Sequence, residues 1–136
     1  MIDTLRVDRV DAFGGARGTS PFLDTLAERS YVFHNAYAPS SWTSPAIASL
    51  FTSRYPSQHD VTHFSSVLAK SEQTLAEQLR KQGYATGGFS SNPLIRGQLG
   101  FAQGFGSFTT AMGRGKSLSQ KIERTHHAGL RATTWL

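Results

Sequence analysis

The stretch SWTSPAIASLFTSRYP, residues 41–56, carries the strongest fold signal in this chain. Ile47, Leu50 and Phe51 recur at the three-to-four-residue spacing of a helix that buries one face. This spacing predicts a helix over residues 44–52 with those three side chains turned inward. The Arg-Tyr-Pro sequence that closes the stretch ends the helix, because proline cannot continue it.

Thr43 stands just before this predicted helix, and Pro45 occupies the first turn, where a missing N–H group costs nothing. The free N–H groups at the start of a helix, together with the helix dipole, bind anions such as phosphate or sulfate. A hydroxyl placed there can attack the phosphorus of a bound ester when a metal or a base lowers its pKa. The alternative is that Thr43 is an ordinary N-cap, for which threonine is a favoured residue. This segment alone leaves both interpretations open.

Asp3 is the second candidate site residue, because residues 1–6 look like the end of a strand that runs into a loop. In open α/β sheets, ligands bind beyond the carboxyl ends of the strands, and a carboxylate there suits a hard divalent cation. The alternative is an aspartate that caps a loop. Since the strand is only a stub, we expect most of it to be missing before Met1.

The remaining periodicity predicts further helices and strands in an order typical of α/β proteins. Ser20 and Pro21 are a good N-cap and first helical residue. The order helix, strand, helix, helix, strand predicts an α/β layered fold with a mainly parallel sheet and flanking helices. The expected elements are a helix over 20–29, a strand at 31–33, an irregular stretch over 57–70, a helix over 74–82 with Leu75, Ala76 and Leu79 inward, and a strand over 85–90.

Composition narrows the class of protein. The 136 residues suffice for one domain, and without cysteines the chain has no disulfide and no thiolate metal site. No apolar run approaches the roughly 20 residues that span a bilayer. The net charge of +5 is concentrated in residues 111–136, which hold five basic residues and one acidic residue. We therefore expect a basic tail there, either disordered or of other origin, and no nucleic-acid-binding face. The alternative is a tail that binds RNA or a membrane surface.

Several short motifs together resemble the N-terminal part of sulfatase-like proteins in the alkaline phosphatase superfamily. The resemblance covers roughly residues 1–108, and its strength comes from the order and spacing of the motifs. The matching segments are 3–8 (DTLRVD), 19–27 (TSPFLDTLA), 33–38 (FHNAYA), 43–45 (TSP) with 50–56 (LFTSRYP) and His59, 74–77 (TLAE) with 83–86 (GYAT), 91–93 (SNP) and 100–105 (GFAQGF).

The resemblance implies a role for two residues. Asp3 matches the first metal-ligating aspartate of the family, and Thr43 matches the nucleophile, which in formylglycine-dependent sulfatases is a modified Cys or Ser. This sequence departs from that pattern at Ile47, where those sulfatases have Arg, and at Thr4, where they usually have a second Asp. Threonine is not a formylglycine precursor, so phosphoryl chemistry is favoured over sulfuryl chemistry. The metal is left open among Zn, Mn, Mg and Ca.

Other polar residues were weighed as site residues and assigned other roles. We expect His59 to be structural, Arg54 to be a solvated charge, and His126 with His127 to be unrelated to a metal. Asn92 is a weak candidate at the end of a strand. The paired Asp-His metal motif of the family does not occur in this chain.

These observations predict that residues 1–110 are the N-terminal portion of a sulfatase-like catalytic domain and residues 111–136 are the basic tail. The predicted function is metal-dependent hydrolysis of sulfate or phosphate esters, with the isolated chain inactive or nearly so, since a metallohydrolase site needs three or more ligands. The alternative is a non-catalytic remnant, or a pseudoenzyme, that binds anions at a helix terminus.

Overall fold

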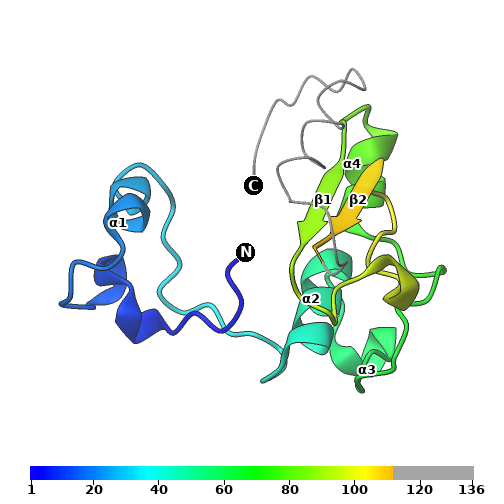
Figure 1. Ribbon diagram of the computed structural model, residues 1–136, viewed down its shortest axis with the longest axis horizontal. Helices are drawn as coiled ribbons and strands as arrows, with labels where there is room; N and C mark the ends of the chain where they lie inside the picture. Colours follow the sequence, from blue (N-terminus) through cyan, green and yellow to red (C-terminus); the bar gives the residue numbers. More distant parts are fainter. Residues whose placement is uncertain (112–136) are drawn as a thin grey trace. The chain divides into compact units, whose positions relative to one another are not determined.

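The computed structural model describes residues 1–111, and these form two compact units (Figure 1). The first unit is Met1–Tyr37, and the second begins at Ala38. The predicted boundary at residues 110 and 111 stays a prediction, and the predicted basic tail lies outside the described residues except for Ala111.

The first unit consists of three short helical segments: η1 (Val7–Arg9), η2 (Asp11–Phe13) and α1 (Pro21–Ala27). Ser20 is the residue before α1 and Pro21 is its first residue, as predicted, although the helix ends two residues before Arg29. The Ser20 hydroxyl accepts a hydrogen bond from the Asp11 N–H at 2.9 Å. The Asp24 carboxylate accepts one from the Ala12 N–H at 2.8 Å. These two bonds fix η2 against the start of α1.

Two expected strands of the first unit are absent from it. Asp3 and Thr4 form a turn, with Thr4 at a φ of 57°, and the rest of residues 1–6 and residues 31–33 are irregular. Within residues 1–37 no strand offers these segments the backbone hydrogen bonds that a strand needs. Tyr31 is 96% exposed and Phe33 76% exposed, so burial within this unit does not hold them in a strand either.

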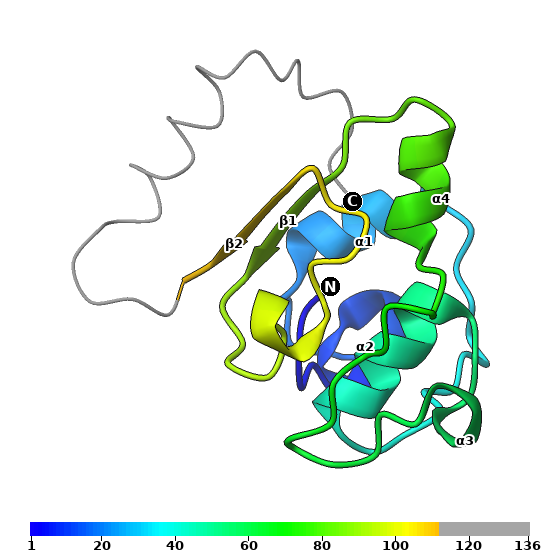
Figure 2. The ribbon, with the colours of Figure 1, turned by 90° about the vertical axis from the view of Figure 1, so that its right-hand side faces the viewer.

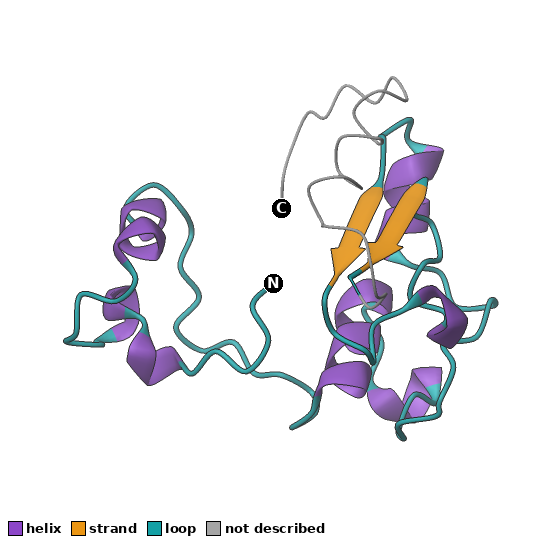
Figure 3. Cartoon of the chain, in the orientation of Figure 1, coloured by secondary structure: helices purple, strands orange, loops and turns teal. Residues whose placement is uncertain are grey.

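The second unit contains α2 (Thr43–Thr52), α3 (Pro56–His59) and α4 (Leu75–Lys81), shown in Figures 1 and 3. The predicted helix α2 is confirmed, but it begins one residue early, so Trp42 is the N-cap. Ile47 is buried as expected and Phe51 partly so, whereas Leu50 is 59% exposed. The buried face instead runs through Ser44, Ile47 and Ala48, which share one side of the helix.

Helix α3 lies in a region where the sequence predicted no regular structure. It is a single turn that ends at Asp60, and Asp60, like Ser53 at the end of α2, adopts a left-handed backbone conformation, with φ values of 60° and 57°. Such a conformation costs a residue other than glycine about 1–2 kcal/mol. Tertiary contacts must therefore hold this turn in place.

Helix α4 shows the clearest agreement with the sequence. Thr74 and Glu77 form a reciprocal capping box at its start, and Gly83 follows its end at a φ of 88°. Ala76 is buried and Leu79 is half-buried, as predicted. Leu75 is 50% exposed, so its predicted inward orientation is wrong.

The sheet has two parallel strands, β1 (Gly87–Ser90) and β2 (Ser107–Thr110), which run side by side in Figure 2. The register pairs Gly87 with Ser107 and Ser90 with Thr110, which confirms the predicted parallel pairing. Gly88 is required at its position, because a Cβ atom there would lie 2.5 Å from the Phe108 ring. Strand β2 was not predicted, since four residues of aromatic and β-branched character are too few to identify a strand.

The core of the second unit joins α2 to the segments that follow it. Two aromatic contacts connect the core to the sheet: Phe51 packs on Phe105 at a ring-centroid distance of 5.8 Å, and Phe105 on Phe108 at 5.4 Å. No helix within residues 1–111 is long and apolar enough to cross a membrane. The buried cluster consists of Ile47, Ala48, Val61, Leu68, Ile95, Leu99 and Phe101, with η3 (Gly97–Leu99) supplying Leu99.

Candidate functional site

Thr43 is the first residue of α2, and its side chain is half-buried. The N-cap position belongs to Trp42, whose backbone is extended and whose carbonyl oxygen accepts the Ala46 N–H at 3.4 Å. Thr43 is therefore not the N-cap of α2. A half-buried hydroxyl in the first turn of a ten-residue helix lies where the helix dipole favours a negative charge.

Ser44 adds a second hydroxyl to the first turn, and the sequence analysis did not identify it. Its side chain is only 1% exposed, and among the described residues Ser44 Oγ has no hydrogen-bond partner. Leaving a buried hydroxyl unpaired costs about 1–3 kcal/mol. Because helix side chains tilt toward the N-terminus, this hydroxyl is directed toward the end of α2 that carries the free N–H groups. The only sequence signal was its place between Thr43 and Pro45.

An aromatic pair flanks this helix terminus. The Trp42 ring contacts the Phe64 ring edge-to-face, with 4.5 Å between the ring centroids. Phe64 is 69% exposed, and it sits in a turn closed by the Ser66 hydroxyl, which accepts hydrogen bonds from the N–H groups of Thr62 and His63. The organic part of an ester bound at α2 can therefore meet an ordered aromatic surface beside Thr43.

Asp3 lies in the first unit, where it is exposed and belongs to a turn and not to a strand. Thr43 lies in the second unit, so each predicted site residue is described within its own unit. Across residues 1–111 no three or more His, Asp or Glu side chains gather where they could hold a metal ion. Asp3 with its described neighbours thus does not make up a complete metal site.

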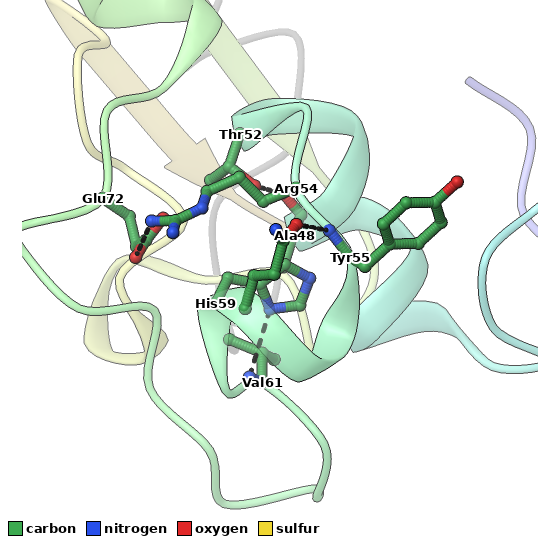
Figure 4. Close-up of polar contacts among 8 residues, drawn as sticks. Ala48, Thr52, Arg54, Tyr55, His59, Val61 and Glu72 are labelled. Carbon is green, nitrogen blue, oxygen red and sulfur yellow. Dashed lines mark hydrogen bonds and ion pairs between the residues drawn. The ribbon is translucent and has the colours of Figure 1, made fainter.

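His59 is a titratable residue that is almost completely buried, and its neighbours are drawn in Figure 4. It is 2% exposed, and both ring nitrogens are hydrogen-bonded: Nε2 to Ser49 Oγ at 2.9 Å, and Nδ1 to the Val61 N–H at 3.1 Å. Burial lowers the pKa of His59, while the nearby Glu72 carboxylate opposes this effect. This geometry agrees with the predicted structural role of His59.

Arg54 is not the solvated charge that the sequence predicted. Its Nη1 atom donates to both Glu72 carboxylate oxygens, at 2.9 and 3.0 Å, as Figure 4 shows. Glu72 is 8% exposed, so Arg54 neutralises a nearly buried carboxylate. A substrate anion would have to compete with that carboxylate for Arg54.

Asn92 follows β1 and organises the turn there. Its Oδ1 atom accepts the Leu94 N–H at 2.8 Å, and its own N–H donates to Ser90 Oγ at 3.2 Å. This position beyond the carboxyl end of a parallel strand is where ligands bind in such sheets. A role of Asn92 in the site stays a prediction.

Comparison with known proteins identifies a family for this sequence. The model of the sulfatase family matches residues 1–126. The chain is 30% identical over 90 residues to an N-acetylgalactosamine-6-O-sulfatase of Bacteroides thetaiotaomicron, covering 62% of this chain. It is 36% identical over 93 residues to arylsulfatase A of Bos taurus, again covering 62% of this chain.

A solved structure shows the same fold. The phosphonate monoester hydrolase of Agrobacterium radiobacter superposes with a TM-score of 0.71 and 27% sequence identity, over 95% of this chain and 29% of that one. The chain spans 18% of the length of each of the two sulfatases named above.

Proposed function

The chain belongs to the sulfatase family, and from this we propose that it carries the nucleophile portion of a metal-dependent hydrolase of phosphate or sulfate esters. The observation that carries the proposal is the place of Thr43, a half-buried residue, at the first position of α2, where the N–H groups of the first turn have no partner within the helix. This is where a bound tetrahedral anion and an attacking hydroxyl come together.

We favour phosphorus esters over sulfate esters as substrates. Threonine lacks the aldehyde on which the formylglycine mechanism depends, and the similarity to a phosphonate monoester hydrolase supports the same choice. In the proposed step, Thr43 Oγ1 forms a bond to phosphorus and the ester oxygen leaves as an alcohol, which takes up the proton lost from Thr43. Water then cleaves the phosphothreonine and restores the hydroxyl.

Asp3 is the residue we assign to the metal, which would be Zn, Mn, Mg or Ca. A divalent ion supplies positive charge that stabilises the transferring group and lowers the pKa of the attacking hydroxyl. Asp3 alone is too few ligands, and the remainder would come from sequence that the longer relatives have in addition to the matched part.

The second candidate function is anion binding without turnover. It is favoured by the lack of any cluster of three metal-ligating side chains within residues 1–111. In this case Thr43 and Ser44 would bind phosphate or sulfate at the start of α2, and no covalent step would follow.

Binding and turnover are tested separately on the full chain. Inorganic phosphate is titrated against the ¹⁵N-labelled protein, and we expect shifts of the Thr43 and Ser44 amides, with no shift at Leu75 in the first turn of α4. Shifts confined to other residues would remove both candidate functions. Phenyl phosphate and phenyl sulfate, each with Zn²⁺ or Mn²⁺, then serve as substrates.

Thr43→Ala and Thr62→Ala are the matched variants for turnover, because Thr62 is an exposed loop threonine of the same unit. In any version of the protein that turns over the phosphate ester, we expect Thr43→Ala to abolish the reaction and Thr62→Ala to retain it. Activity that survives in Thr43→Ala would exclude Thr43 as the nucleophile. Phosphate binding without turnover, in this chain and in a longer version that includes the flanking sequence, would favour the second candidate.

A further inference from the structure

We infer that the protonation state of His59 decides whether Val61, at the end of the segment Ser53–Val61 called here the α3 turn, stays packed beside helix α2. The Ser49–His59 hydrogen bond to α2 and the Arg54–Glu72 ion pair are polar contacts of this segment with its surroundings, and Val61 at its end packs in the core cluster. The proposal concerns the conformation of the second unit, so it does not depend on the proposed function.

The two hydrogen bonds of His59 define its tautomer. The Val61 N–H can only donate, so Nδ1 of His59 must carry a lone pair and cannot carry a proton. The proton of the neutral ring is therefore on Nε2, which donates to Ser49 Oγ. This tautomer also excludes His59 as a base for Ser49, because Nε2 has no free lone pair to accept the serine proton.

Protonation of the ring breaks one of these bonds and preserves the other. An Nδ1–H group would face the Val61 N–H, and two donors cannot share a hydrogen bond. The Nε2–H group would continue to donate to Ser49. Val61 is fully buried in the core cluster with Ile47 and Leu68, so separating its N–H from His59 disturbs the packing beside α2.

Backbone hydrogen bonds hold helix α3 together independently of the His59 ring. They join the Gln58 N–H to the Tyr55 carbonyl at 2.8 Å and the Asp60 N–H to the Pro56 carbonyl at 3.0 Å. Asp60, the C-cap of α3, has a left-handed backbone at a φ of 60° and lies between His59 and Val61. Loss of the Val61–His59 bond would let Asp60 relax, while the bonds inside α3 and the Ser49–His59 contact remain.

Five influences act on the charge of His59. Burial is the largest and lowers its pKa, and the Arg54 guanidinium acts in the same direction. The carboxylates of Glu72 and Asp60 act in the opposite direction, as does a hydrogen bond of His59 with its own backbone, which raises its pKa. The net effect is a pKa below the ordinary histidine value of about 6.5, so the ring is neutral at pH 7.

The pH dependence follows from this direction. Because the unfolded chain binds the proton more readily than the folded one, the contribution of His59 to stability is present above pH 6.5 and is lost as the pH falls through the lower pKa of the folded state. Between pH 6.5 and that lower pKa, each unit by which the pH falls raises the equilibrium constant for opening by up to about tenfold, and below that pKa it levels off.

The test is an NMR titration of the full chain between pH 7.5 and 4.5. The ring ¹⁵N shifts of His59 should show protonated Nε2 and unprotonated Nδ1 at neutral pH. The exchange rate of the Val61 amide, corrected for the intrinsic effect of pH, should rise by up to about tenfold per unit as the pH falls from 6.5 toward the pKa of His59 and should then level off. A proton on Nδ1 at neutral pH, or titration of His59 without faster Val61 exchange, would overturn the inference.

Two variants sharpen the test. His59→Gln supplies a neutral donor and acceptor that cannot titrate, so Val61 exchange should lose its pH dependence. His63→Gln removes an exposed histidine four residues away and should leave that dependence unchanged. Retention of the full pH dependence in His59→Gln would assign it to another group. If His59→Gln does not fold, the wild-type titration and the His63 variant still decide the outcome.

Discussion

At the scale of single residues, the second unit combines polar side chains that are nearly buried and yet almost all paired. Glu72 meets Arg54, and His59 meets Ser49 and Val61, so burial is offset by hydrogen bonds. Ser44 Oγ is the exception among the described residues of this unit. Its position beside Thr43 is the reason to look for a ligand there and not elsewhere.

Glu72→Gln should lower the pKa of His59 further below its ordinary range. The Glu72 carboxylate favours the protonated imidazole, and the amide of the variant keeps the shape but not the charge. The measurement is the His59 ring titration by NMR, with Glu77→Gln on α4 as the control. A higher His59 pKa in Glu72→Gln would contradict the electrostatic account.

At the scale of elements, the helices differ in how far their stability depends on residues within the helix and how far on contacts with the rest of the unit. Helix α4 is defined by its own capping residues, since Thr74 and Glu77 satisfy each other's backbone N–H groups. Helix α2 has no side-chain cap of this kind, and its stability comes from the face that packs into the core. Helix α3 depends on contacts outside itself, because it is a single turn and its C-cap Asp60 has a left-handed backbone.

Thr74→Ala should reduce the free energy of unfolding by about 1–2 kcal/mol, at the upper part of the range for lost caps. Thr74 Oγ1 accepts the Glu77 N–H and also contacts the Gln103 carbonyl at 3.2 Å, and the side chain is 1% exposed. Urea unfolding at pH 7 measures the change. Thr74→Ser should recover most of the loss, and an unchanged midpoint in Thr74→Ala would show that the cap contributes nothing.

At the scale of the whole molecule, the described residues have a small core and expose many large apolar side chains. Phe22, Tyr31 and Tyr37 in the first unit are each more than two-thirds exposed, as is Phe64 in the second. Such surface is typical of regions that another polypeptide covers or that cause aggregation. The chain also spans only 18% of the length of the sulfatases compared with it, which fits the first explanation.

The full chain by itself should bind a divalent metal too weakly to stabilise its fold. A ligand raises stability only when its concentration exceeds its dissociation constant, and Asp3 is a single candidate carboxylate. We therefore expect the thermal unfolding midpoint to be unchanged by Zn²⁺ or Mn²⁺ at about the protein concentration. A complete site would show itself in a midpoint that rises with metal in the wild type and in Asp8→Asn and that does not rise in Asp3→Asn.

The sequence by itself determined the family, the parallel α/β class, helix α2 and the capped helix α4, because these depend on short motifs and on spacing within one segment. It could not determine which side of each helix is buried, as Leu50 and Leu75 show. It also could not pair Arg54 with Glu72, or His59 with Ser49, since these partners lie 18 and 10 residues apart. Only the packing of the second unit brings them together, and burial then gives the His59 contacts the strength to control a local conformation.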